Sequence, residues 1–238
     1  MLGTRRISRR SSTTSPSCTR KWGNYVEART LFERALAIDR RDLDGDAPNV
    51  AALLPNLASL HLDLGEYADA ERLATEALAI YRRVPDGASN DIAAVLDTLG
   101  VLRKRQGDYA GAERHYQDAL AAFGPERNSV VRANLADLYE VIGDFARSEK
   151  LYSDVLRERE EQYGPDQPAV ARTLNNLGEL YRSTGRLDEA ARFHQRALAI
   201  RRRLGEHHPD IATSLNNLAF VDLDAGKYTM RSTCWARC

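Results

Sequence analysis

The sequence predicts an all-α protein built from stacked helical hairpins. A glycine recurs along the 238-residue chain at steps of 42, 42, 36, 42 and 41 residues. These glycines are Gly23, Gly65, Gly107, Gly143, Gly185 and Gly226. The same residue types return at fixed offsets on both sides of them, and prolines precede several repeats. A period of this size indicates a repeat protein, in which each unit buries its apolar face against its neighbours.

Two helices are expected to flank each glycine, because the recurring side chains fall on one helical stripe on either side of it. Leucine stands eight residues before the glycine at Leu57, Leu99, Leu135, Leu177 and Leu218, and the next residue is always small. A residue that is mostly aromatic stands two after it, at Tyr25, Tyr67, Tyr109, Phe145, Leu187 and Tyr228. A mostly small residue stands twelve after it, at Ala35, Ala77, Ala119, Val155 and Ala197. The predicted unit is a helix A, a tight turn at the glycine and an antiparallel helix B.

Prolines mark where helix A begins. Pro48, Pro168 and Pro209 each stand seventeen residues before a turn glycine, in the first helical turn, where a missing N–H costs nothing. Pro55 lies about two turns inside its helix A. There it should remove one backbone hydrogen bond and kink the helix, at a cost of about 3 kcal/mol.

The stretches TLNNLGELYRSTGRLDEAARFHQRALAI from Thr173 and LGEHHPDIATSLNNLAF from Leu204 resemble the tetratricopeptide repeat (TPR), in its 42-residue kinesin-light-chain-like variety. The resemblance implies an α-solenoid, a right-handed TPR superhelix whose A helices line a concave groove. The short step into Gly143 resembles a repeat in which the end of helix B and the linker are trimmed by six residues. Asp222 departs from the pattern, since it stands where Tyr139 and Tyr181 stand in their repeats.

Three segments are predicted. Residues 1–22 form a disordered, basic, Ser/Thr-rich tail, and residues 229–238 form an irregular tail. Residues 23–228 form the TPR domain, with an orphan helix B, four full or nearly full repeats and a final helix A.

The pattern stops at both ends of this domain. Pro16 lies in a Ser/Thr run that cannot supply the helix A expected before Gly23, and Arg231 replaces the alanine that the next helix B should carry. The final helix A is therefore expected to expose Ile211, Leu215 and Leu218. Either these ends pair with another chain, or the chain is a fragment whose terminal residues come from an altered reading frame.

Composition limits the partners. The chain has 34 basic and 34 acidic residues, which argues against a phosphate-binding surface and thus against nucleic acid. It has neither an apolar run long enough for a membrane helix nor the apolar core of a secretory signal. We therefore expect a cytoplasmic protein without a membrane partner. Residues 1–21 hold six basic and no acidic residues, so an organelle transit peptide is the minor alternative.

We expect no enzyme and no cofactor. Cys18, Cys234 and Cys238 lie in the tails, and their odd number excludes a disulfide framework. His207 and His208 belong to a linker, which we favour over a metal site. The chain has neither a nucleophile with a partnered base in a known motif nor a Gly-rich phosphate loop. No catalytic, cofactor-binding or metal-binding residue is therefore assigned.

The candidate ligand-binding positions are residues of helix A that point away from its apolar stripe. Nine residues before the glycine stand Asn56, Thr98, Asn134, Asn176 and Asn217, and ten before it stand Asn175 and Asn216. An amide offers both a donor and an acceptor, so a row of amides can grip an extended peptide backbone, a use that the resemblance also implies. Alternatively, each amide bonds to the neighbouring repeat and fixes the stacking. The two roles are compatible.

Charged residues beside this row would set the ligand preference. The basic residues assigned to the groove are Lys104, Arg105 and Arg182, and the acidic one is Glu179. Further acidic residues lie close in the pattern, at Asp63, Asp97, Asp137, Glu140 and Asp224. The mixture favours a mixed-charge peptide over a purely acidic one, and a solvated face is the alternative. The arginines at 201–203 are interpreted either as an anion patch or as cations at the negative end of a helix dipole.

The sequence thus predicts a non-catalytic scaffold that binds a peptide segment of a partner protein in its groove. Two alternatives remain open. The chain could be a sensor or regulatory fragment of a larger multidomain signalling enzyme. It could also be a structural repeat protein that self-assembles end to end, as a homo-oligomer through its uncapped ends.

Overall fold

A computed structural model describes residues 25, 27–38, 48–84, 89–123, 129–205 and 210–226. Every regular element in these ranges is an α-helix, and none is a strand, as predicted. The helices are α2 (Pro48–Leu64), α3 (Tyr67–Tyr81), α4 (Ser89–Arg105), α5 (Tyr109–Ala122), α6 (Ser129–Val141), α7 (Phe145–Tyr163), α8 (Pro168–Ser183), α9 (Leu187–Arg203) and α10 (Asp210–Asp224). Residues 25 and 27–38 are also helical and are called the N-terminal helix below. The predicted tails, 1–22 and 229–238, lie outside the described residues.

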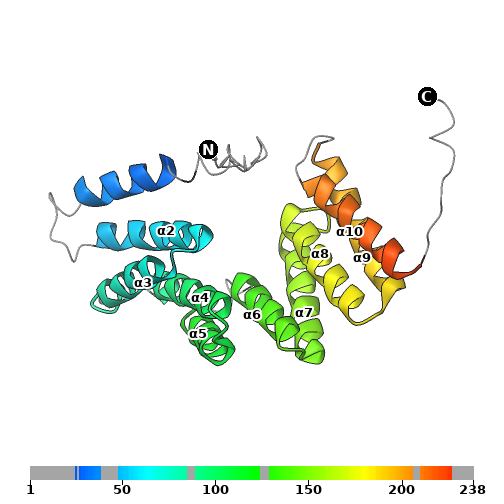
Figure 1. The fold of residues 1–238 in the computed structure, drawn as a ribbon, viewed down its shortest axis with the longest axis horizontal. Coiled ribbons are helices and arrows are strands. Elements are labelled where there is room, and N and C mark those ends of the chain that lie inside the picture. Colours follow the sequence, from blue (N-terminus) through cyan, green and yellow to red (C-terminus); the bar gives the residue numbers. More distant parts are fainter. Residues whose placement is uncertain are drawn as a thin grey trace, which may run out of the picture. The chain divides into compact units, whose positions relative to one another are not determined.

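The chain divides into two compact units, Met1–Pro85 and Asp86–Cys238. In the first unit, α2 and α3 pack as one antiparallel hairpin. In the second unit, α4 pairs with α5, α6 with α7 and α8 with α9, while α10 packs on α9 (Figure 1). The A helices of the second unit also touch in succession, α4 with α6, α6 with α8 and α8 with α10. This is the predicted order of A and B helices.

Each described turn glycine ends a helix A in a left-handed conformation. Gly65, Gly107, Gly143 and Gly185 have φ between 76 and 82°, a region that glycine enters without steric cost. The following residue donates its N–H to a carbonyl five residues earlier, as from Arg186 to Tyr181 over 2.8 Å. This bond and the glycine's own bond three residues back form a Schellman motif, which satisfies the last carbonyls of helix A. The glycine period therefore reports a helix C-cap.

Within a repeat, helices A and B approach most closely over a small residue. A Cβ atom built on Gly178 would lie 2.5 Å from the His194 ring, and one on Gly100 would lie 2.5 Å from the Tyr116 ring. The small residue stands seven before the turn glycine, and the ring stands nine after it. Both rings are fully buried. These contacts explain why the residue after each recurring leucine in the pattern is small.

Two details bear on the sequence-based expectations. Pro55 lies inside α2, and this helix continues through the proline from Pro48 to Leu64. The short repeat step is hardly reflected in helix B, because α5 has 14 residues and α3, which belongs to a 42-residue step, has 15. Helix A differs more, since α6 has 13 residues whereas α4 has 17.

Buried arginines join successive repeats. One of them is Arg201, for which the anion-patch interpretation is therefore wrong. Arg201 is only 6% exposed, and its Nη1 donates to Ser214 Oγ over 2.5 Å and to the Asp210 carbonyl over 3.2 Å. Arg159 makes the equivalent bonds one repeat earlier, from Nη1 to Thr173 Oγ1 over 2.7 Å and to the Ala169 carbonyl over 3.3 Å. Each guanidinium therefore joins a helix B to the first turns of the next helix A.

Across residues 25, 27–38, 48–84, 89–123, 129–205 and 210–226, none of the helices combines the length and the apolar character needed to cross a bilayer.

The packing predicts the effect of two core substitutions. Leu177 is 1% exposed, so Leu177→Ala should leave a cavity and lower the free energy of unfolding by about 2 to 5 kcal/mol. Gly178→Leu should also destabilise, because its side chain would overlap the buried His194 ring. Urea denaturation measures both. Leu223→Ala is the control, since Leu223 is half exposed and should lose well under about 1 kcal/mol. Unchanged midpoints in both core variants would mean that the repeat register is wrong.

Candidate functional site

A surface pocket of about 510 Å³ opens between α6, α7 and α8 in the second unit. Its walls combine carboxylates, apolar side chains and one amide. They are formed by Asp137, Glu140, Val141, Phe145, Tyr152, Asn176, Glu179 and Ser183. We call it the α6–α8 pocket.

The repeat brings these residues together. Asp137 and Glu179 both stand six residues before their turn glycines, and Glu140 stands three before, so they share one face of neighbouring A helices. Tyr152 of α7 is 1% exposed, and its hydroxyl accepts a hydrogen bond from Asn176 Nδ2 over 3.5 Å. The pocket thus has polar walls from two A helices, and a buried aromatic ring from the helix B between them lines it.

The carboxylates of the pocket differ in how they are paired. Asp137 forms an ion pair with Lys104 of α4. Glu179 accepts from Arg182 over 3.0 Å, and Arg182 also bridges to Asp224 of α10 over 2.9 Å. Among the described residues, the carboxylate of Glu140 has neither an ion-pair nor a hydrogen-bond partner. The pocket therefore offers one carboxylate that its own cations do not neutralise.

This environment raises the pKa of Glu140 to about 7. Burial is the largest cause, and the negative charges of Asp137 and Glu179 add to it, while Arg182 and Lys104 act in the opposite direction. Near pH 7 the group is divided between its neutral and charged forms. A cation entering the pocket would favour the charged form.

Next to the pocket, His194 lies fully buried under Gly178, and its Nε2 lies 3.4 Å from Glu179 Oε1. Neither ring nitrogen has a hydrogen-bond partner, and burial lowers the pKa of the imidazole. The neutral ring therefore acts as packing against helix A and not as a base.

The predicted amide row divides into two groups. Asn134 Nδ2 donates to the carboxylate of Asp97 over 2.8 and 3.1 Å, and Asn217 Nδ2 donates to Asn175 Oδ1 over 3.0 Å. Both bonds cross from one A helix to the preceding one, so they fit the stacking interpretation. Asn176 makes only the long bond to Tyr152 and faces the pocket.

The remaining predicted positions are placed as follows. Asn56 and Thr98 bond to carbonyls of their own helices, over 3.3 Å to Ala52 and 3.0 Å to Ala94. Asn56 belongs to the first unit. Asn216 and Arg105 are exposed, on α10 and at the end of α4. The structure therefore gathers Asn176, Glu179 and the carboxylates of α6, with Lys104 and Arg182 pairing at the edge.

Sequence reasoning missed the apolar part of this pocket. Phe145, assigned to the buried stripe, is 37% exposed and lines the pocket beside Val141. Tyr152 was not singled out, although its offset of nine residues from the turn glycine is shared by Tyr116 and His194. That offset is the signal that could have found it.

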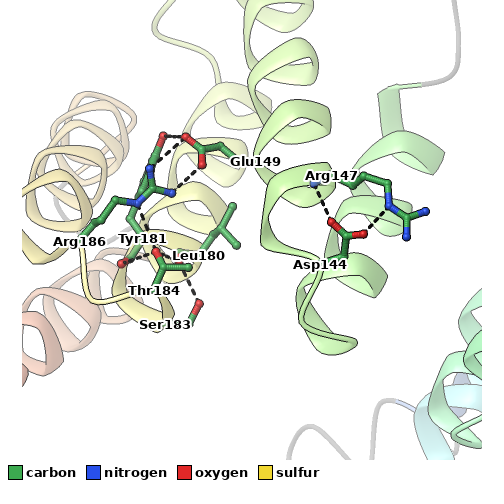
Figure 2. Close-up of polar contacts among 8 residues, drawn as sticks. All are labelled: Asp144, Arg147, Glu149, Leu180, Tyr181, Ser183, Thr184 and Arg186. Atoms are coloured by element: carbon green, nitrogen blue, oxygen red, sulfur yellow. Dashed lines mark hydrogen bonds and ion pairs between the residues drawn. The ribbon is translucent and has the colours of Figure 1, made fainter.

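A polar cluster holds the α8–α9 turn to α7, as Figure 2 shows. The Tyr181 hydroxyl donates to Glu149 Oε1 over 2.8 Å, and Arg186 Nη2 donates to Glu149 Oε2 over 2.6 Å. The Arg186 guanidinium also lies over the Tyr181 ring, 4.1 Å from its centroid. The same arrangement occurs one repeat earlier, with Tyr139, Glu113 and Arg147. These contacts fix the turns between helices A and B.

Other places in the described residues give weaker indications of a binding site. In the first unit, a cavity of about 420 Å³ lies between the N-terminal helix and the α2–α3 turn, but His61, Glu66 and Arg29 at its edge are already paired with one another. No group of three His, Cys, Asp or Glu residues able to hold a metal ion occurs in the part of the chain that the structure describes.

Family comparison agrees with this architecture. A model of the tetratricopeptide repeat matches residues 18–83, 51–123, 129–203 and 182–230, and a second model of the same repeat matches residues 98–159. The chain therefore belongs to the tetratricopeptide repeat family. The family and fold are those of protein-interaction scaffolds and are typically non-catalytic.

Solved structures show the same fold. BtubC (BKLC) from P. vanneervenii is 28% identical, with a TM-score of 0.71 over 86% of this chain and 84% of that one. The nearly identical TPR-like repeats of a putative kinesin light chain from Podosopora anserina are 19% identical, with a TM-score of 0.58 over 78% and 91%. The predicted kinesin-light-chain-like TPR architecture is confirmed.

A curated relative covers less of the chain. A nucleotide-binding leucine-rich repeat (NLR)-like protein from Hyaloscypha variabilis is 45% identical over 51 residues. This match covers 21% of the chain and spans 5% of the relative's length.

The raised pKa of Glu140 predicts a pH-dependent effect on stability. The native carboxyl keeps its proton between about pH 4.5 and about pH 7, where the unfolded chain releases it. Its contribution to stability is therefore present below about pH 4.5 and is lost as the pH rises through about 7. Glu140→Gln cannot ionise, so it should unfold at higher urea concentration than wild type at pH 8 and at a similar concentration at pH 4.5.

Glu161→Gln is the matched control, because Glu161 is exposed on α7 and does not line the pocket. This variant should follow wild type at both pH values. A Glu140→Gln midpoint that equals wild type at pH 8 would contradict the assigned environment of Glu140.

Proposed function

We propose that the protein is a non-catalytic scaffold whose second unit binds an extended peptide segment of a partner protein along the A helices. The observation that carries this proposal is the α6–α8 pocket with its unpaired carboxylate, Glu140. The family supports the scaffold role, and the pocket supports the kind of ligand.

The chemistry of the pocket favours a lysine or arginine side chain as its occupant. Glu140 would be the primary partner of the cation, and Glu179 or Asp137 could share the charge. Val141 and Phe145 would cover the methylene groups of the incoming side chain, since both are exposed beside the carboxylates. The cations Lys104 and Arg182 already have partners, so an acidic ligand residue would have to break an existing ion pair.

Asn176 is the amide best placed to bind the peptide backbone. It faces the pocket and makes only a long bond to Tyr152. Asn134 and Asn217 would contribute chiefly by holding neighbouring A helices in register, as their bonds to Asp97 and Asn175 support. The mixed-charge peptide expected from the sequence thus becomes a peptide with at least one basic side chain.

A second candidate function is that of a sensor or regulatory array within a larger signalling protein. The likeness to an NLR-like protein favours it. In that role the same pocket would bind a peptide that carries the signal, and peptide binding would change the activity of an attached effector domain. Self-assembly through the ends is compatible with either role, because the pocket and the ends are different surfaces.

Peptide display tests the preference for a basic residue. Random dodecapeptides selected on the wild-type protein should be enriched in lysine or arginine at one position. For the best synthetic peptide, Glu140→Gln should raise Kd by about tenfold to a hundredfold at pH 8, because a charge-assisted hydrogen bond is worth about 1.5 to 3 kcal/mol. Wild-type affinity should rise between pH 6 and pH 8, while Glu140→Gln affinity should not.

Glu161→Gln should bind the peptide as wild type does. Selected peptides without a basic residue, or equal affinity of Glu140→Gln and wild type, would contradict the proposed occupant of the pocket.

Single amide substitutions separate backbone binding from stacking. Asn176→Ala should weaken the same peptide by about twofold to tenfold, the value of one neutral hydrogen bond, and leave the melting temperature nearly unchanged. Asn134→Ala should lower the melting temperature, because Asp97 loses its partner while it remains partly buried. Full peptide affinity in Asn176→Ala would rule out the amide contact.

A further inference from the structure

The last helix of the second unit leaves one apolar face uncovered by any helix among the described residues. Leu215 of α10 is 46% exposed, whereas its equivalent Leu174 in α8 is fully buried. Ala219 is exposed as well, although the equivalent Gly178 is buried under a ring. In complete repeats these positions contact the helix B of the same repeat. The exposed face of α10 is therefore the one that a helix A turns toward its own helix B.

The N-terminal helix shows the reverse situation in the first unit. Ile38 is 45% exposed, whereas its equivalent Ile200 in α9 is 2% exposed. Ala35 and Phe32 are only half-buried. The residues equivalent to Ala35 in all four complete repeats are fully buried, namely Ala77, Ala119, Val155 and Ala197. The N-terminal helix thus exposes the face that a helix B turns toward its own helix A.

The α8–α9 repeat shows what these faces would form if they met. There, Val170, Ala171 and Leu174 of helix A pack in one core cluster with Ala197 and Ile200 of helix B. Counted from the turn glycines, the same offsets hold Ile211, Ala212 and Leu215 in α10 and Ala35 and Ile38 in the N-terminal helix. All five positions carry an apolar residue of similar size.

The close contact between the two helices is also reproduced. Offsets of seven before and nine after the glycine pair Gly178 with His194 in one repeat and Ala136 with Tyr152 in another. The corresponding pair here is Ala219 in α10 and Phe32 in the N-terminal helix. It again sets a small residue against an aromatic ring.

We propose that α10 of one copy and the N-terminal helix of a second copy complete one TPR repeat, so that copies of the chain associate head to tail. The flanking sequence favours a second copy over the chain's own tails. At the offset of the expected alanine after Gly226 stands Arg231, and Pro16 occupies the small-residue position before Gly23. Because the two contacting surfaces are different, each copy keeps one face free and the association can continue.

Light scattering coupled to size-exclusion chromatography tests this interface. Wild-type protein should increase in mass as its concentration is raised. Leu215→Glu blocks the α10 face and Ile38→Glu blocks the N-terminal helix, so each variant alone should need at least about tenfold higher concentration to associate. Val130→Glu is the matched control, since Val130 is 48% exposed on α6 and belongs to neither of the two faces, and it should associate as wild type does.

Mixing the two blocked variants gives the decisive result. Each keeps the face that the other has lost, so an equimolar mixture should form 1:1 dimers that grow no further. Ala219→Arg is a second α10 variant, which should replace Leu215→Glu in the mixture with the same result. Circular dichroism of each variant confirms that the helices are retained.

Three results would overturn the proposal. A wild type that stays monomeric would show that residues of the same chain cover these faces. Association that Ile38→Glu does not weaken would show that two α10 helices pair symmetrically. A mixture that remains monomeric, with both variants folded, would show that the two faces do not bind each other. None of these results affects the peptide-binding proposal, which is measured on the α6–α8 pocket.

Discussion

The close contact between helices A and B over a small residue is the constraint on which the rest of this structure depends. Where Gly100 or Gly178 stands, a buried ring from helix B fills the space that a larger side chain would take. Ala136 is the corresponding small residue beside the ring of Tyr152, and the same tyrosine lines the α6–α8 pocket. The contact that closes a hairpin therefore also brings a ring and a hydroxyl to the candidate binding surface.

Polar contacts govern the step from one repeat to the next. Arg159 and Arg201 reach from a helix B to hydroxyls and carbonyls of the following helix A, and Asn134 and Asn217 join successive A helices. Burial lowers the pKa of Arg159 to about 10, yet its hydrogen bonds satisfy the guanidinium. Such groups are costly to bury without partners, so they specify the register of stacking more strictly than apolar contacts do.

The two proposals use different surfaces for the same physical reason. A repeat does not supply a partner for every charged or apolar side chain, and in both proposals the side chains without a partner are the ones that bind. In the middle of the array, the side chain without a partner is the carboxylate of Glu140, because the neighbouring cations are already paired. At the ends it is the apolar face that a missing half-repeat would cover, as at Leu215 and Ile38.

The sequence by itself determined the helical hairpins, their turns and their buried stripes, because these follow from local chemistry: only glycine enters the left-handed cap without cost, and side-chain offsets place residues on one helical face. It also placed Asn134, Asn176 and Asn217 on one row. Only the tertiary structure decided that Asn134 and Asn217 bond between helices while Asn176 faces a pocket. It likewise decided that Arg201 is buried and Phe145 partly exposed. Those outcomes depend on distances between repeats, which residue spacing within one helix does not encode.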